Sequence, residues 1–529
     1  MSSGNRTFKA GIDLASASRR REEMSLSLRN KKKEEMLEKK RRGVKDPQDQ
    51  VAVTFADAPP TDSPDAIDHT MNYGVDRLPE MIEMISGPDR CKQNEGLVMI
   101  RKLLSTENNP PLGTVIKTGC LPLIMQFLQN AADPQLQFEA AWILTNIASG
   151  EQQHTHEVVN HNAIPTLLDL FQSPSEEVRE QAVWTIGNIA GDCTACRDKC
   201  LLAGTLQKLL WLLCNTHSEM QIVRNIVWTL SNLCRGKPSP DISQVQEALP
   251  IVVNLLTHTD EEVVVDAAWA ISYISDATED RINMVIESGV LPTMIHFLTF
   301  SNSSRQIPAI RTIGNIVTGT DMQTQVIVDA GALMNFHHLL TSPKRNVRKE
   351  TLWTISNIAA GTHDQVQAVV NSGLLPLVVA QLGAPEFEVR KEATWVISNV
   401  TMCGDDQQAK QLLDFDVIQP LCEILSLHDS KATIIALETL EHLLQIGLTQ
   451  VEMANSMSGG GGFVHEDSNP VARAIIECGG LTKIDDLQNH RSDEIYQLSA
   501  RIIDDYFSFD DEQDMPEEDE ENKGSAFQF

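Results

Sequence analysis

A Trp-x-x-x-Asn motif recurs along the 529-residue chain at a nearly constant spacing, and this repeat constrains the fold more than any other feature. The motif occurs as "WILTN", "WTIGN", "WTLSN", "WTISN" and "WVISN", which begin at Trp142, Trp184, Trp228, Trp353 and Trp395. Degenerate copies, "WAISY" at Trp269 and "RTIGN" at Arg311, fill the middle. Successive first positions are 42, 44, 41, 42, 42 and 42 residues apart. A fixed period of this length predicts a repeat array. We call these positions the Trp/Asn ladder.

Each unit of the array carries helix signals. In residues 162–191, Ser173 and the glutamates after it predict the start of a helix, and Gly191 predicts its end. One arc of the helical wheel is apolar and predicts the core face: Val178, Ala182, Ile186, Ile189 and Ala190. A different arc carries Gln181, Trp184 and Asn188. The ladder residues are therefore predicted to lie off the core face.

The length of the unit predicts the fold class. Repeats of about 42 residues with two or three helices are typical of armadillo or HEAT arrays, whose last helices line a concave surface. We predict an all-helical solenoid of about ten such units over residues 73–503. A basic arm over 1–43 and a flexible linker over 44–72 precede it, and an acidic tail over 504–529 follows it.

The ladder also predicts a ligand. Trp and Asn at i and i+4 stand one above the other on a helix, and an Asn amide can accept from and donate to the backbone of an extended peptide. Slots between stacked indoles suit the aliphatic stem and the cationic head of Lys or Arg, worth about 0.5 to 2 kcal/mol each. Tyr273 and Arg311 interrupt the ladder, which predicts two separate sites. The alternative for any single copy, and our interpretation of Trp211 in "LLWLLC", is ordinary core packing.

Charge is distributed unevenly along the chain, whose formal net charge is −30. Residues 1–45 hold 14 Lys/Arg against 6 Asp/Glu, whereas residues 504–521 hold 11 acids and no base. The acidic remainder should repel nucleic acid and attract cations. Tethered to the body by its linker, the arm has a high effective concentration over the array. Its "KKRR" segment (Lys39–Arg42) is therefore predicted to compete for the basic-peptide groove of its own chain.

The chain resembles the importin alpha (karyopherin alpha) family from its basic arm to its acidic tail. The resemblance rests on the Arg/Lys-rich arm, the interrupted ladder and "GGLTKIDDLQNHRSDEIYQLSARIIDDYF" near the end. It implies a right-handed superhelical armadillo-repeat solenoid and an adapter that binds nuclear localisation signals on cargo. It further implies that importin beta takes the arm, that the complex crosses the nuclear pore, and that Ran-GTP dismantles it. The protein is then expected to shuttle between cytoplasm and nucleus.

The same resemblance implies residue roles. The major cargo site matches Trp142, Asn146, Gly150, Thr155, Gln181, Trp184, Asn188, Asp192, Trp228 and Asn232, with Gly150, Thr155 and Asp192 at the pocket for the principal lysine. The minor site matches Asn315, Val317, Thr324, Glu350, Trp353, Asn357, Glu392, Trp395 and Asn399. The autoinhibitory cluster matches Lys40, Arg41 and Arg42. Importin beta contacts match Arg19, Arg20, Arg21, Arg29, Lys31, Lys32 and Lys33. The last repeat resembles the surface bound by the export receptor that recycles the adapter.

Other functions find little support in the sequence. "CTACRDKC" (Cys193, Cys196, Cys200) has metal-like spacing but no matching second cluster, so ordinary reduced thiols are predicted and no metal. "SGGGGF" (Ser458–Phe463) lacks the lysine of a phosphate loop and predicts a flexible insertion. We predict no catalytic residue, no cofactor and no membrane-spanning helix, since no apolar run approaches the roughly 20 residues that one needs. Two rivals remain: a catenin-like armadillo scaffold, and a nucleic-acid-binding protein that uses the arm.

Overall fold

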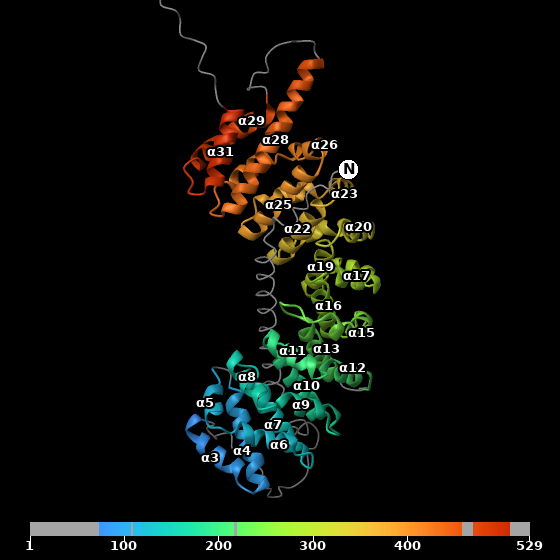
Figure 1. Ribbon diagram of the computed structural model, residues 1–529, viewed down its shortest axis with the longest axis vertical. Coiled ribbons are helices and arrows are strands. Elements are labelled where there is room, and N and C mark those ends of the chain that lie inside the picture. Colours follow the sequence, from blue (N-terminus) through green and yellow to red (C-terminus); the bar gives the residue numbers. More distant parts are fainter. Residues whose placement is uncertain (1–73, 107–108, 216–219, 458–468, 508–529) are drawn as a thin grey trace, which may run out of the picture. The chain divides into compact units, whose positions relative to one another are not determined.

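The computed structural model describes residues 74–106, 109–215, 220–457 and 469–507 (Figure 1). The predicted arm, the linker and the insertion at Ser458–Phe463 lie outside the described residues, as does the tail beyond residue 507. The chain divides into two compact units, Met1–Ala332 and Leu333–Phe529. Within the described ranges every regular element is a helix, which confirms the all-helical prediction.

The helices of the first unit are short except for one long helix in each repeat. They are η2 Val75–Arg77, α3 Leu78–Ser86, α4 Arg90–Leu104, α5 Leu112–Lys117, α6 Leu121–Gln129, α7 Pro134–Ile147, α8 Gln152–Asn160, α9 Ala163–Asp169, η3 Leu170–Gln172, α10 Glu176–Ala190, α11 Thr194–Leu202, α12 Thr205–Asn215, α13 Met220–Cys234, α14 Ile242–Val245, α15 Ala248–Leu255, α16 Glu261–Ser275, α17 Glu279–Glu287, α18 Leu291–Leu298, α19 Ser303–Ile316 and α20 Asp321–Asp329.

The second unit continues the pattern and ends in a longer helix with a final helical group. Its elements are η4 Ala332–Asn335, α21 Phe336–Leu340, α22 Arg345–Ala359, α23 His363–Asn371, α24 Leu375–Leu382, α25 Phe387–Cys403, α26 Asp406–Lys410, η5 Leu413–Phe415, α27 Ile418–Ile424, α28 Ser430–Met457, α29 Pro470–Glu477, α30 Gly480–Leu487 and α31 Asp493–Tyr506.

The long last helix of each repeat carries the ladder and packs on its counterparts. In the first unit α7, α10, α13, α16 and α19 pack in that order, as Figure 1 shows, and in the second unit α22 packs on α25 and α25 on α28. Helix α10 begins after its N-cap Ser175, two residues beyond the predicted Ser173, and Ser175 Oγ accepts from the Val178 backbone N–H. It ends at Gly191 as predicted. The predicted apolar arc of α10 is buried. Stacked last helices therefore supply a continuous core.

Ion pairs join successive last helices at their N-terminal ends. Asp133, the N-cap of α7, accepts a hydrogen bond of 2.9 Å from Arg90 of α4. Asp260, the N-cap of α16, accepts one of 3.1 Å from Arg224 of α13. These hydrogen bonds lower the pKa of both carboxyl groups below their ordinary value of 3.8. Each carboxylate thus caps its own helix and holds the preceding one.

Replacing Asp133 and Asp260 together with asparagine is expected to flatten the acid limb of the stability profile. Their lowered folded-state pKa means that their contribution is fully present above 3.8, the unfolded value, and is lost as pH falls through the folded value. Asparagine still caps a helix, so only the ion pair is removed. Urea midpoints at neutral pH and near pH 3 measure the difference. An equal acid-induced loss in the native and variant chains would contradict this prediction.

In the part of the chain that the structure describes, no single helix has the length and apolar character required to cross a membrane. One bent pair, α23 with α24, meets the length and composition requirement jointly, with an angle of 85° between its halves.

Candidate functional site

The ladder asparagines tie each last helix to the one before it. Asn188 Nδ2 donates to the Thr145 carbonyl at 3.2 Å, and Asn232 Nδ2 donates to the Gly187 carbonyl at 3.1 Å. The same bond joins Asn315 to Ser272 at 2.9 Å and, in the second unit, Asn399 to Ser356 at 2.8 Å. Asn146 and Asn357 vary the pattern: Asn146 Nδ2 donates to Ser105 Oγ at 3.0 Å, and Asn357 Nδ2 to the Trp353 carbonyl of its own helix at 2.8 Å. The amide nitrogens are therefore already engaged within the protein.

Amide oxygens on the same stripe are buried without a donor. Among the described residues, no group donates a hydrogen bond to Asn188 Oδ1, Gln181 Oε1 or Asn399 Oδ1. The three side chains are almost fully buried. The other end of Gln181 is fixed, because its Nε2 donates to Thr145 Oγ1 at 2.5 Å. A buried acceptor without a donor costs free energy, so this stripe is prepared for N–H groups from elsewhere.

The ladder indoles are covered rather than standing open. Within the whole 529-residue chain the exposed fractions are 9, 0, 3, 3 and 8% for Trp142, Trp184, Trp228, Trp353 and Trp395. Trp184 and Trp228 form a hydrophobic cluster of two. The ring of Trp228 lies against the α10 backbone: a Cβ added to Gly187 would lie 2.8 Å from its Cε3 atom. The helical wheel predicts that these rings lie off the core face, whereas all five are buried and the neighbouring helix covers Trp228 closely.

Arginines of the chain itself lie over two rings of the ladder in the first unit. The Arg101 guanidinium lies 4.3 Å from the ring centre of Trp142, and Arg311 lies 5.5 Å from that of Trp269. Tyr273 also stacks on Trp269, with 5.7 Å between the two ring centres. Where the ladder is interrupted, side chains of the protein itself therefore already contact the Trp269 ring. These contacts demonstrate that ladder indoles accept guanidinium groups.

The predicted lysine pocket brings Thr155 and Asp192 together. Thr155 Oγ1 lies 3.2 Å from Asp192 Oδ1 and 3.3 Å from the Ala148 carbonyl oxygen at the end of α7. Asp192 Oδ2 is buried and has no hydrogen-bond partner among the described residues. Gly150 lies in the turn between α7 and α8, where an added Cβ would lie 2.6 Å from His154 Nδ1. The pocket therefore presents a carboxylate oxygen beside a closely packed turn.

Residues of the predicted minor site fall in both units, and each group is described by itself. In the first unit, Thr324 Oγ1 donates to the Val317 carbonyl at 3.3 Å, which repeats the geometry of Thr155 and Ala148. The third member of this group, Asn315, is buried. In the second unit Glu350, Trp353, Asn357, Trp395 and Asn399 are buried on α22 and α25, and Glu392 is half-buried. The predicted autoinhibitory and importin-beta-binding residues lie outside the described residues.

Sequence reasoning missed several side chains at the site. Thr145 and Thr185, 2.6 Å apart, link Gln181 to the α7 backbone. Arg101 also pairs with Glu139 at 2.5 Å, and burial raises the pKa of this carboxyl group despite the arginine. The sequence marks Arg311 as unusual because it replaces a ladder tryptophan, but no pattern in the sequence marks Arg101 or the two threonines.

Three family models match the chain. The model described as "Importin beta binding domain" matches residues 5–98. The model "Armadillo/beta-catenin-like repeat" matches residues 108–149, 151–191, 197–235, 238–276, 320–360 and 362–402, and "Atypical Arm repeat" matches 469–523. Among solved structures, a crystal structure of an engineered protein matches with a TM-score of 0.69 and 26% identity, covering 83% of this chain and all of the other. The armadillo-repeat fold is confirmed.

Curated relatives match along nearly their whole length. "Importin subunit alpha-2" of Arabidopsis thaliana is 49% identical over 99% of this chain and 94% of its own. "Importin subunit alpha-B" of Dictyostelium discoideum is 44% identical over 99% of this chain and 96% of its own. "Importin subunit alpha-3" of Arabidopsis thaliana is 42% identical over 99% and 95%. With an importin-beta-binding segment, an armadillo array and full-length similarity of this degree, the chain belongs to the importin alpha family.

Proposed function

We propose that this nuclear import adapter holds the basic nuclear localisation signals of cargo proteins on its Trp/Asn ladder and binds importin beta through its N-terminal arm. Its relatives are transport adapters rather than enzymes. The family model over residues 5–98 supports the partnership with importin beta. The ladder and the acidic character of the remaining chain support a basic peptide as the ligand.

The single observation that carries the ladder half of the proposal is the set of buried acceptors at Asn188 and Gln181. An extended peptide presents backbone N–H groups at regular intervals, and these can donate to the two amide oxygens. Leaving a buried acceptor unpaired costs about 1 to 3 kcal/mol, and hydrogen bonds from the backbone of a bound peptide would remove this cost. The Nδ2 bond of Asn188 to Thr145 fixes the direction of its oxygen beforehand.

The ring contacts suggest where ligand cations bind. Arg101 and Arg311 lie over Trp142 and Trp269, at the two ends of the ladder in the first unit. The rings between them, Trp184 and Trp228, belong to the predicted major site and are assigned to ligand side chains. The principal lysine is assigned to Asp192, whose Oδ2 is buried without a donor among the described residues.

Competition by the arm gives the adapter its switch. Residues 1–45 have a net charge of +8 and are tethered to a body that carries the remaining excess of acids. When importin beta captures the arm, the ladder is released for cargo. In the same scheme the last repeat contacts the export receptor, passage through the nuclear pore depends on importin beta, and the protein shuttles between cytoplasm and nucleus.

Deleting residues 1–72 is expected to tighten binding of a Lys-rich peptide by at least about tenfold, because a tethered competitor at roughly millimolar effective concentration is removed. Fluorescence anisotropy of a labelled peptide, on the full chain and on the shortened chain, measures the change. Adding importin beta to the full chain should reproduce the deletion. The shortened chain should not respond to importin beta at all.

Acrylamide quenching of tryptophan fluorescence in the same two chains provides the control. Deletion should raise the accessibility of the ladder indoles, whereas exposed Trp211 contributes equally to both samples. Unchanged peptide affinity would end the competition proposal. Unchanged quenching together with absent peptide binding would show that the rings belong to the packed interior, and would end the ladder proposal as well.

A further inference from the structure

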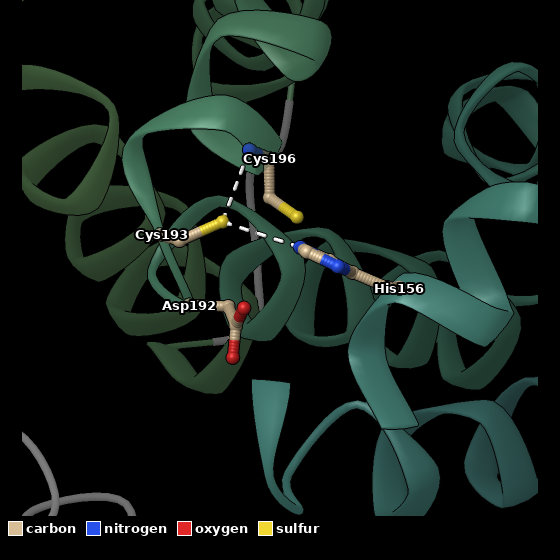
Figure 2. Close-up of side chains that lie close together, drawn as sticks. All are labelled: His156, Asp192, Cys193 and Cys196. Carbon is tan, nitrogen blue, oxygen red and sulfur yellow. Dashed lines mark hydrogen bonds between the residues drawn. The ribbon is translucent and has the colours of Figure 1, made fainter. Parts of the chain in front are cut away.

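Four side chains with metal-binding atoms converge between α8 and the start of α11 (Figure 2). His156 comes from α8, Asp192 and Cys193 from the turn after α10, and Cys196 from the first turn of α11. One donor atom from each residue can be chosen so that all four lie within 4.8 Å of one another. His156 Nε2 lies 3.5 Å from Cys193 Sγ, the contact dashed in Figure 2. A single small cation can therefore reach all four groups.

Two sulfurs, one imidazole nitrogen and one carboxylate oxygen form a ligand set that suits zinc. Zinc binds four ligands tetrahedrally, with Zn–S distances of about 2.3 Å and Zn–N distances of about 2.0 Å, which places sulfur and nitrogen about 3.5 Å apart. The distance from His156 to Cys193 already has this value. Magnesium and calcium prefer oxygen ligands throughout, so the two cysteines exclude them.

We propose that His156, Asp192, Cys193 and Cys196 form a zinc site, and that bound zinc takes Asp192 away from the lysine pocket. The metal site is independent of the function proposed above, but the effect of zinc on peptide binding rests on that function. Zinc would then be an antagonist of basic peptides at the major site, because one carboxylate cannot serve both cations at full strength.

The contacts of the four residues leave their ligand atoms available. Asp192 Oδ2 is buried and has no hydrogen-bond partner in the described part of the chain, while Oδ1 is held by Thr155. Cys193 and Cys196 are both free thiols. The Cys196 backbone N–H lies 3.4 Å from Cys193 Sγ, an outer contact of the kind that supports a metal-bound thiolate.

The proposed site departs from the sequence prediction that "CTACRDKC" holds ordinary reduced thiols. Cys200, the third cysteine of that motif, does not belong to the cluster. The other two ligands are supplied by His156, from an earlier helix, and by Asp192, which directly precedes Cys193. Because neither His156 nor Asp192 is a cysteine, the spacing of the cysteines alone does not indicate them.

Zinc titration of the reduced, metal-free, full-length chain tests the site directly. A competing chromophoric chelator reports the affinity, and cobalt in place of zinc reports thiolate ligation through its charge-transfer absorption. We expect one equivalent to bind, with the affinity falling at least about tenfold in Cys193→Ser and in His156→Gln. Cys91→Ser and Cys214→Ser, which change exposed cysteines elsewhere, are matched controls. The absence of a stoichiometric site, or equal losses in the control variants, would overturn the proposal.

Peptide binding with and without one equivalent of zinc tests the antagonism. Zinc should weaken binding of a Lys-rich peptide at least about tenfold in the native chain, as expected when a charged partner is withdrawn, and should have no effect in Cys193→Ser. Zinc binding with unchanged peptide affinity overturns the antagonism. If the full chain binds zinc but neither it nor the chain lacking residues 1–72 binds peptide, the function proposed for the ladder is overturned. The metal site is not.

Discussion

Replacing Trp184 and Asn188 together with alanine is expected to weaken binding of a Lys-rich peptide by about 100-fold or more. The double substitution removes a ring assigned to a ligand cation and the amide oxygen Oδ1 assigned to the ligand backbone. Central aromatic residues at interfaces each contribute about 2 to 4 kcal/mol, and 1.4 kcal/mol corresponds to tenfold in affinity. Anisotropy titrations on the chain lacking residues 1–72 measure the loss without competition from the arm.

The control for this variant must separate lost recognition from lost folding. Trp184 is completely buried, and truncating such a residue to alanine costs about 3 to 5 kcal/mol of stability. The full-length variant should still bind importin beta through its arm with native affinity, and Asn188→Ala alone should weaken the peptide to a smaller extent. Trp211, predicted to be an ordinary packing residue, is instead 51% exposed, and it lies off the ladder. Trp211→Ala should therefore leave peptide affinity unchanged. Native affinity in the double variant would contradict the ladder proposal.

Gly187→Val is expected to destabilise the contact between α10 and α13. A Cβ at Gly187 would lie 2.6 Å from Thr229 Oγ1 and 2.8 Å from Trp228 Cε3, closer than side-chain atoms approach one another. Helix α13 must therefore move away from α10, and overpacking of this kind costs about 1 to 3 kcal/mol or more. Because Trp228 moves with its helix, peptide affinity should fall in parallel. Urea midpoints and the same anisotropy titration measure both effects.

Gly383→Ala is the matched control for the glycine substitution. Its added Cβ would have the Ala380 carbonyl oxygen as its nearest neighbour, at an ordinary van der Waals distance of 3.7 Å. Stability should therefore stay within about 0.5 kcal/mol of the native chain. If Gly187→Val behaved like this control, the close approach of α13 to α10 would be wrong.

Periodicity predicts most of the fold. A spacing of about 42 residues predicts the order of the last helices, and local signals such as Glu176 and Gly191 mark the ends of α10. Full-length similarity to importin alpha subunits also decides against the catenin-like rival. These features are predictable because each depends on residues within one repeat.

The site is less predictable because its interactions join different repeats. A helical wheel assigns Asn188 to the same stripe as Gln181 and Trp184 but cannot show that its amide nitrogen donates to Thr145, 43 residues earlier. Likewise it cannot bring Arg101 over Trp142, or His156 to Cys193. Contacts of this kind depend on how far one repeat is rotated against the next, which the pattern within a repeat does not encode.

The bonds from the ladder asparagines to the preceding helix hold successive ladder positions at a fixed spacing. Asn188 and Asn232 hold the carbonyls of Thr145 and Gly187, so the interval between two recognition side chains is set by the same bonds that join the repeats. Widening one interval to suit a longer ligand would break a buried hydrogen bond, whereas looping out the extra ligand residue would leave the protein unchanged. On the proposed ladder, an insertion between two bound lysines is therefore expected to be accommodated by the peptide and not by the adapter.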